Sequence, residues 1–150
     1  MSDVILLDTG PLGLVAHPKA SKENDECNEW LRSTLTQGKC VLVPGISDYE
    51  LRRELLRMGS SQGLAKLDAL KNFLGFVPIT TDAMNQAAEF WAKARSLGKP
   101  TAPDQALDGD MILSGQAVVM MAQGHSVVIA TTNVKHLDLF TEARIWREIV

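Results

Sequence analysis

The chain has 150 residues, of which 45% are hydrophobic and 22% are charged, and its net charge at pH 7 is −3. This length predicts a single domain, residues 1–150, with enough chain to bury a core. The acidic balance excludes bulk attraction to nucleic acid, so any such binding needs a local basic patch. Cys27 and Cys40 lack the spacing of a zinc site or a disulfide framework. No signal peptide or membrane-spanning stretch is visible, so we expect a cytoplasmic protein with no membrane partner.

The first stretch of interest is the apolar run of residues 4–7, which ends abruptly at Asp8 and is followed by Gly10 and Pro11. A run this short suits a strand buried on both faces, and the Gly-Pro pair breaks it. A carboxylate just beyond a central parallel strand lies where open α/β sheets bind their ligands. Burying that charge costs several kcal/mol unless it meets a cation or hydrogen-bond donors. The structural alternative is an Asp that only forms a turn.

The rest of the chain is predicted to alternate helices with short strands. The predicted helices are residues 12–16, 21–38, 49–58, 60–73, 81–98 and 110–124, with residues 99–109 as a loop. Ser47 or Asp48 is expected to cap the third of these helices, and Thr81 or Asp82 the fifth. The further predicted strands are residues 40–43, 76–79, 127–130 and 145–146, and Pro78 favours an edge position for residues 76–79. This alternation predicts an α/β fold with a mostly parallel central sheet.

Acidic and amide side chains follow several of these predicted strands. Asp8 follows the first strand, Asn133 follows residues 127–130, and Glu50 is expected in the first turn of the helix 49–58. Asp108 and Asp110, with Asp104, cluster at the start of the late helix. Because the carboxyl ends of parallel strands meet at one edge, these side chains are expected there together. Gathered acids repel each other unless cations lie among them, and oxygen ligands of this kind suit Mg²⁺ or Mn²⁺.

Each of these acids also has a purely structural interpretation. Asp108 and Asp110 could cap the late helix, and Glu50 could belong to a solvated helix face beside Arg53 and Arg57. If Asp108 and Asp110 were both helical, their side chains would point roughly 200° apart. Both can therefore serve one site only if Asp108 precedes the helix.

Taken together, four segments resemble a PIN domain of the VapC-like kind found as toxins in bacterial toxin–antitoxin pairs. The segments are residues 6–12 (LLDTGPL), 48–55 (DYELRREL), 107–117 (LDGDMILSGQA) and 130–133 (ATTN). The resemblance spans nearly the whole chain and implies a three-layer α/β/α fold. It departs from the family's pattern at Asn133, where a fourth Asp is frequent, and at His136-Leu137, which replace an aromatic residue.

The resemblance implies a metal-dependent endoribonuclease that leaves a 5′-phosphate and a 3′-hydroxyl. By this likeness, Asp8, Glu50 and Asp110 are the catalytic acids that hold Mg²⁺ or Mn²⁺. Asn133 and Asp108 are the candidates for a second ion. The expected partners are RNA, a small antitoxin protein and a second copy of the chain in a homodimer. Basic residues near the acids are the candidate RNA contacts: Arg52, Arg53 and Arg57, with Lys93, Arg95 and Lys99. The alternative is a PIN-fold scaffold that binds RNA or protein without catalysis.

Overall fold

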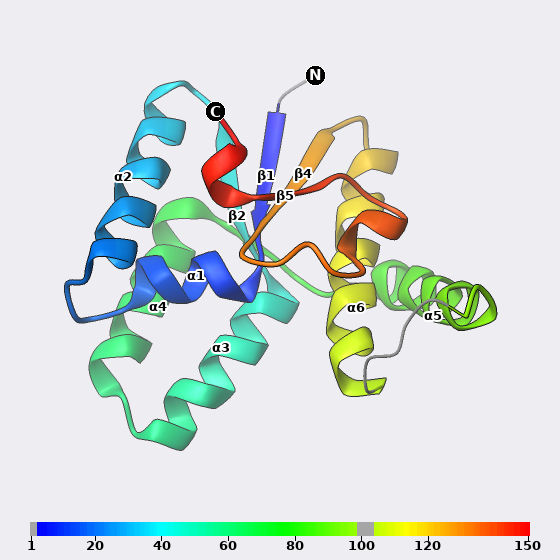
Figure 1. The fold of residues 1–150 in the computed structure, drawn as a ribbon, viewed down its shortest axis with the longest axis horizontal. Coiled ribbons are helices and arrows are strands. Elements are labelled where there is room, and N and C mark those ends of the chain that lie inside the picture. Colours follow the sequence, from blue (N-terminus) through cyan, green and yellow to red (C-terminus); the bar gives the residue numbers. More distant parts are fainter. Residues whose placement is uncertain (1–2, 99–103) are drawn as a thin grey trace.

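The computed structural model describes residues 3–98 and 104–150. Figure 1 shows a central sheet with helices on both of its faces. The strands are β1 (Asp3–Leu7), β2 (Cys40–Pro44), β3 (Phe76–Val77), β4 (Ser126–Thr131) and β5 (Ala143–Ile145). The helices are α1 (Thr9–Ala16), α2 (Lys22–Thr36), α3 (Gly45–Met58), α4 (Ser61–Leu74), α5 (Thr81–Ser96) and α6 (Asp104–Ala122). Two short 3₁₀ turns follow at Leu137–Leu139 and Trp146–Glu148.

All the strand pairs of the sheet are parallel, in the order β3-β2-β1-β4-β5. β1 therefore lies at the centre, with Ile5 paired to Val41 on one side and to Val128 on the other. β3 lies at the edge, as Pro78 predicted, and is only two residues long. The predicted α/β fold with three layers is confirmed.

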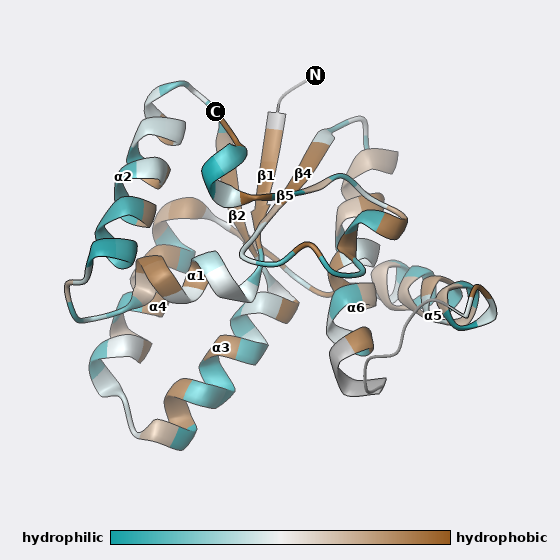
Figure 2. Ribbon diagram, in the orientation of Figure 1, coloured by the Kyte–Doolittle hydropathy of each residue, from teal (hydrophilic) through white to brown (hydrophobic). Residues whose placement is uncertain are grey.

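The side chains of β1 alternate between two hydrophobic cores. Ile5 and Leu7 pack in one core with residues of α1, α2 and α4, whereas Val4 and Leu6 pack in the other with residues of α6. Figure 2 shows this pattern as apolar strands between helices that carry polar residues on their outer sides. α5 packs on α6 through a third cluster that contains Ala87, Ala94, Leu107 and Met111. β1 is buried on both faces, and its carboxyl end leads directly to Asp8, which is only partly buried.

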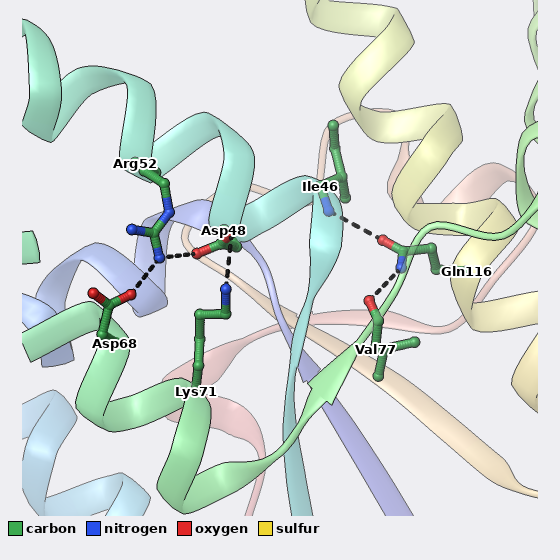
Figure 3. Close-up of polar contacts among 7 residues, drawn as sticks. All are labelled: Ile46, Asp48, Arg52, Asp68, Lys71, Val77 and Gln116. Carbon is green, nitrogen blue, oxygen red and sulfur yellow. Dashed lines mark hydrogen bonds and ion pairs between the residues drawn. The ribbon is translucent and has the colours of Figure 1, made fainter.

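α3 begins earlier than predicted, because its N-terminus is capped from another helix. The predicted caps, Ser47 and Asp48, lie inside the helix, and the N-cap residue Pro44 makes no side-chain cap. The side chain of Gln116 on α6 takes this role: its Oε1 accepts from the Ile46 N–H at 3.3 Å (Figure 3). Its Nε2 donates to the Val77 carbonyl at 2.9 Å, which ties the end of β3 to the same point.

α6 also begins earlier than predicted, at Asp104, so residues 104–109 are helical rather than part of a loop. Leu107 and Met111 are both buried against α5, and this packing extends the helix upstream of Asp110. A smaller error concerns α5, which is capped by Thr80 rather than by Thr81 or Asp82: the Thr80 hydroxyl accepts from the Ala83 N–H. Among the described residues, no helix has both the length and the apolar character needed to cross a bilayer.

Candidate metal centre at the carboxyl edge of the sheet

Asp8 lies directly beyond the carboxyl end of the central strand, where it also caps α1. Its Oδ1 accepts from the Thr9 N–H at 2.8 Å, and its Oδ2 accepts from the Thr131 hydroxyl at the end of β4, at 2.7 Å. Burial raises the pKa of Asp8 above its ordinary value, and the two hydrogen bonds and Lys135 oppose that rise. Asp8 therefore caps a helix, as its structural interpretation predicted. The cap compensates only part of its negative charge, so Asp8 is also suited to bind a cation.

Glu50 reaches the same place from α3. Its Oε1 accepts from the Thr9 hydroxyl at 2.7 Å. Thr9, the residue that follows Asp8, thus orients Glu50. Because α3 begins at Gly45, Glu50 lies in the second helical turn rather than the first. Its other oxygen lies against α6 at Gly109, where an added Cβ would come within 2.5 Å of Oε2. Because Gly109 has no side chain, Glu50 Oε2 can lie beside the residue that directly precedes Asp110.

Asp110 completes the group from α6. Its pKa is raised to about 7, first by burial and then by the charge of Asp8, with a smaller contribution from Glu50. Lys135 and a hydrogen bond from the His136 backbone act in the opposite direction. Mutual repulsion among carboxylates is what a cluster of acids shows without its cation. The structure therefore brings the three predicted catalytic acids into one electrostatic unit.

The two candidates for a second ion are placed differently. Asn133 lies at the same edge of the sheet, exposed, with its N–H donating to the Thr131 hydroxyl that in turn holds Asp8. Asp108 is exposed and helical, so the condition for its sharing a site with Asp110 is not met. It lines a cleft between α5 and α6 with Met84, Trp91 and Met111 instead.

The donor set fits a hard divalent cation in chemistry, although the acids are not preassembled around one. Within residues 3–98 and 104–150, no three His, Cys, Asp or Glu side chains stand ready to enclose a metal ion. Glu50 accepts from the Thr9 hydroxyl through Oε1, whereas its Oε2 lies on the Gly109 side, beside α6. Carboxylate oxygens that repel one another at the end of a central strand are nevertheless ligands that Mg²⁺ and Mn²⁺ prefer.

Sequence reasoning missed the groups that orient these acids. Thr9 and Thr131 hold Glu50 and Asp8, and the only sequence signal was their position beside the predicted strand ends. Lys135 was assigned no role, yet its charge acts on both Asp8 and Asp110. It has a φ of 44°, which is unusual for a residue with a side chain.

The predicted RNA contacts divide into engaged and exposed residues. Arg52 donates to Asp48 at 2.9 Å and to Asp68 at 2.6 Å, and Lys71 donates to the other oxygen of Asp48 (Figure 3). This network points Arg52 toward α4 and makes it a structural residue. Arg53 is exposed and lies over the Tyr49 ring. Arg57 is exposed and paired with Glu54.

The remaining basic candidates belong to the region around α5. Lys93 lies near the Phe140 ring and Arg95 near the Trp91 ring. Lys99 lies outside the described residues.

The sequence matches no protein-family model and no curated protein. Solved structures, in contrast, match over nearly their whole length. VapBC2 from Rickettsia felis, bound to a DNA fragment from its promoter, matches with a TM-score of 0.74 and 14% identity over 95% of this chain and 98% of that one. FitAcB from Neisseria gonorrhoeae matches with a TM-score of 0.69 and 18% identity over 97% and 99%. DNA-bound VapBC from Salmonella typhimurium matches with a TM-score of 0.65 and 18% identity over the same shares.

At these identities the likeness concerns the fold. It confirms the PIN-like architecture that the four sequence segments implied, with an all-parallel sheet of five strands.

Proposed function

We propose that this protein is a Mg²⁺- or Mn²⁺-dependent endoribonuclease, and that it serves as the toxin of a toxin–antitoxin pair. The observation that carries the proposal is the convergence of Asp8, Glu50 and Asp110 at the end of β1, where the pKa of Asp110 is raised to about 7. A scaffold gains nothing from gathering acids that repel one another. A cation-binding site requires them.

In this proposal each acid is oriented by a neighbour on the chain. Thr131 and the Thr9 N–H hold Asp8, the Thr9 hydroxyl holds Glu50, and the backbone at His136 holds Asp110. A bound divalent ion would supply Lewis acidity and lower the pKa of a water that attacks the phosphorus of the RNA backbone. Asp110 would give up its proton when the cluster takes up the cation. The exposed guanidiniums of Arg53 and Arg57 are the candidates for phosphate contacts.

The partner proposal rests on the solved relatives, which are VapBC and FitAcB structures. By analogy, this chain would bind a small antitoxin and form a homodimer. Co-expression with the neighbouring reading frame tests this: a toxin is expected to arrest growth alone and to form a stable complex when the neighbour is present.

Cleavage of RNA by the purified protein tests the enzymatic proposal. We expect the protein to cleave RNA in the presence of Mg²⁺ or Mn²⁺. Cleavage should cease when excess EDTA is added and should be absent in Asp8→Asn. The exposed Asp25→Asn on α2 provides a matched control that removes one acid elsewhere. Cleavage that persists in EDTA or in Asp8→Asn would contradict the proposal. Metal binding without cleavage of any RNA would favour the scaffold alternative.

A further inference from the structure

The segment after β4 passes over two of the three acids. At one end, the Thr131 hydroxyl accepts from the Asn133 N–H and donates to Asp8. At the other end, the backbone N–H of His136 donates to Asp110. Lys135 lies between these two anchors, and its positive φ of 44° marks a backbone conformation that side-chain-bearing residues rarely adopt. The two hydrogen-bonded anchors hold this turn in place and keep Lys135 beside both Asp8 and Asp110.

The charges of this group balance differently from those of a site with four acids. Asp8, Glu50 and Asp110 contribute three negative charges, and Lys135 contributes one positive charge. The remaining two negative charges match one divalent ion. A fourth acid at position 133 would add a negative charge and favour a second ion. Residue 133 is Asn, whose side chain is neutral. Asn133 and Lys135 are two positions apart in the segment whose ends contact Asp8, through Thr131, and Asp110, through the His136 backbone.

We propose that Lys135 is the built-in second cation of this site, so that the three acids hold one divalent ion and the lysine ammonium supplies the remaining positive charge. The inference rests on the proposed metal-dependent function and deepens it. Lys135 lowers the pKa of both Asp8 and Asp110, which agrees with a position near both carboxylates. In the metal-free protein the ammonium offsets part of the repulsion. During the reaction the lysine charge would stabilise the phosphate, so that no second ion has to be recruited.

Calorimetric titration with Mn²⁺ tests the proposal without measuring activity. The wild type is expected to bind one ion. Lys135→Met keeps an unbranched side chain on the same backbone and removes the charge, so the first ion should bind about tenfold more tightly, as expected when one unit charge near a divalent ion is removed. Lys135→Arg should keep the wild-type affinity. Lys22→Met, on the exposed start of α2, is the matched control and should also behave as the wild type.

Restoring the fourth acid sharpens the test. Asn133→Asp alone should still bind one ion, because Lys135 offsets the new charge, whereas Asn133→Asp combined with Lys135→Met should bind two. Unchanged affinity in Lys135→Met, or two ions in the wild type, would overturn the role of Lys135 while leaving the metal site intact. A wild type that binds no Mn²⁺ would overturn the proposed metal-dependent function itself, and this inference with it. Thermal melts in EDTA check that each variant is folded.

Discussion

Asp48 and Glu50 lie two residues apart on α3, and the helix directs them roughly 200° apart, into different surroundings. Asp48 enters a network in which two carboxylates, Asp48 and Asp68, meet two cations, Arg52 and Lys71 (Figure 3). Glu50 enters a group of three carboxylates, with Lys135 as the cation that acts on Asp8 and Asp110. The charges of the Asp48 network balance within the protein, whereas the group around Asp8 carries an excess of negative charge.

The comparison separates structural charge from functional charge. In the balanced network, Arg52 holds the pKa of Asp68 below its ordinary value and stays protonated itself. In the unbalanced group, the pKa of Asp8 and that of Asp110 are raised. The charged form of such an acid needs stabilisation from outside the chain, and we propose that a divalent ion provides it here.

The largest expected effect is on activity, from removing one charge of the unbalanced group. Asp8→Asn should reduce metal-dependent RNA cleavage by roughly a thousandfold or more, since it weakens the ligand that fixes the attacking water. Asn can still cap α1 through its side-chain oxygen, so the metal-free protein should be as stable as the wild type or slightly more stable. Cleavage assays and thermal melts in EDTA measure both quantities. A large loss of stability would mean that Asp8 serves mainly as a structural cap.

Breaking the balanced network should have the opposite signature. Asp48→Asn leaves the half-buried Lys71 without its carboxylate and should lower the free energy of unfolding by about 2 kcal/mol. Its Mn²⁺ affinity should match that of the wild type, because Asp48 faces α4 rather than the acids. Urea denaturation and calorimetry test the two halves of this prediction. The exposed Asp68→Asn should lower the free energy of unfolding less than Asp48→Asn does, because solvent screens the pair of Asp68 with Arg52.

The raised pKa of Asp110 predicts how the stability of the metal-free protein changes with pH. The folded protein holds a proton on Asp110 up to about pH 7, whereas the ordinary value for an unfolded Asp is 3.8. Between these pH values the folded state binds more protons, so the free energy of unfolding should fall as the pH rises from about 4 to about 7. Asp110→Asn should flatten this slope. Urea denaturation in EDTA at pH 5 and pH 8 measures it, and an equal slope in both proteins would refute the assignment.

The smallest expected effect concerns Asp108, which the sequence suggested as a second-ion ligand. Because Asp108 is exposed on α6 beside the α5 cleft, Asp108→Asn should change Mn²⁺ affinity by less than about twofold, as expected for a charge that is screened by solvent. A tenfold loss would show that α6 unwinds at its start to bring this acid into the site.

What the sequence revealed depended on how local each signal was. The central strand and Asp8 could be predicted, because a short apolar run that ends in an acid can be identified from the first eight residues alone. The start of α3 could not, since its cap comes from Gln116, which is 70 residues away from Ile46 in the chain. The structural role of Arg52 was equally hidden, because one of its partners, Asp68, belongs to α4.

The errors around the site have the same origin. The start of α6 was missed because burial of Leu107 against α5 overrides the loop-like composition of the preceding residues. Lys135 was missed because its place among the acids depends on a turn conformation with positive φ that the residue type does not favour. In both cases tertiary packing decided the local structure.

We propose that the acids around Asp8 form a cation site, whereas the network around Asp48 does not. The most direct measurement is the shift in melting temperature that Mg²⁺ produces at pH 7.5 in the wild type, Asp110→Asn and Asp48→Asn. A ligand that binds the folded state raises its melting temperature. We expect the melting temperature to rise in the wild type and by an equal amount in Asp48→Asn, whose starting temperature is lower, but little or not at all in Asp110→Asn. No rise in the wild type, or an undiminished rise in Asp110→Asn, would contradict it.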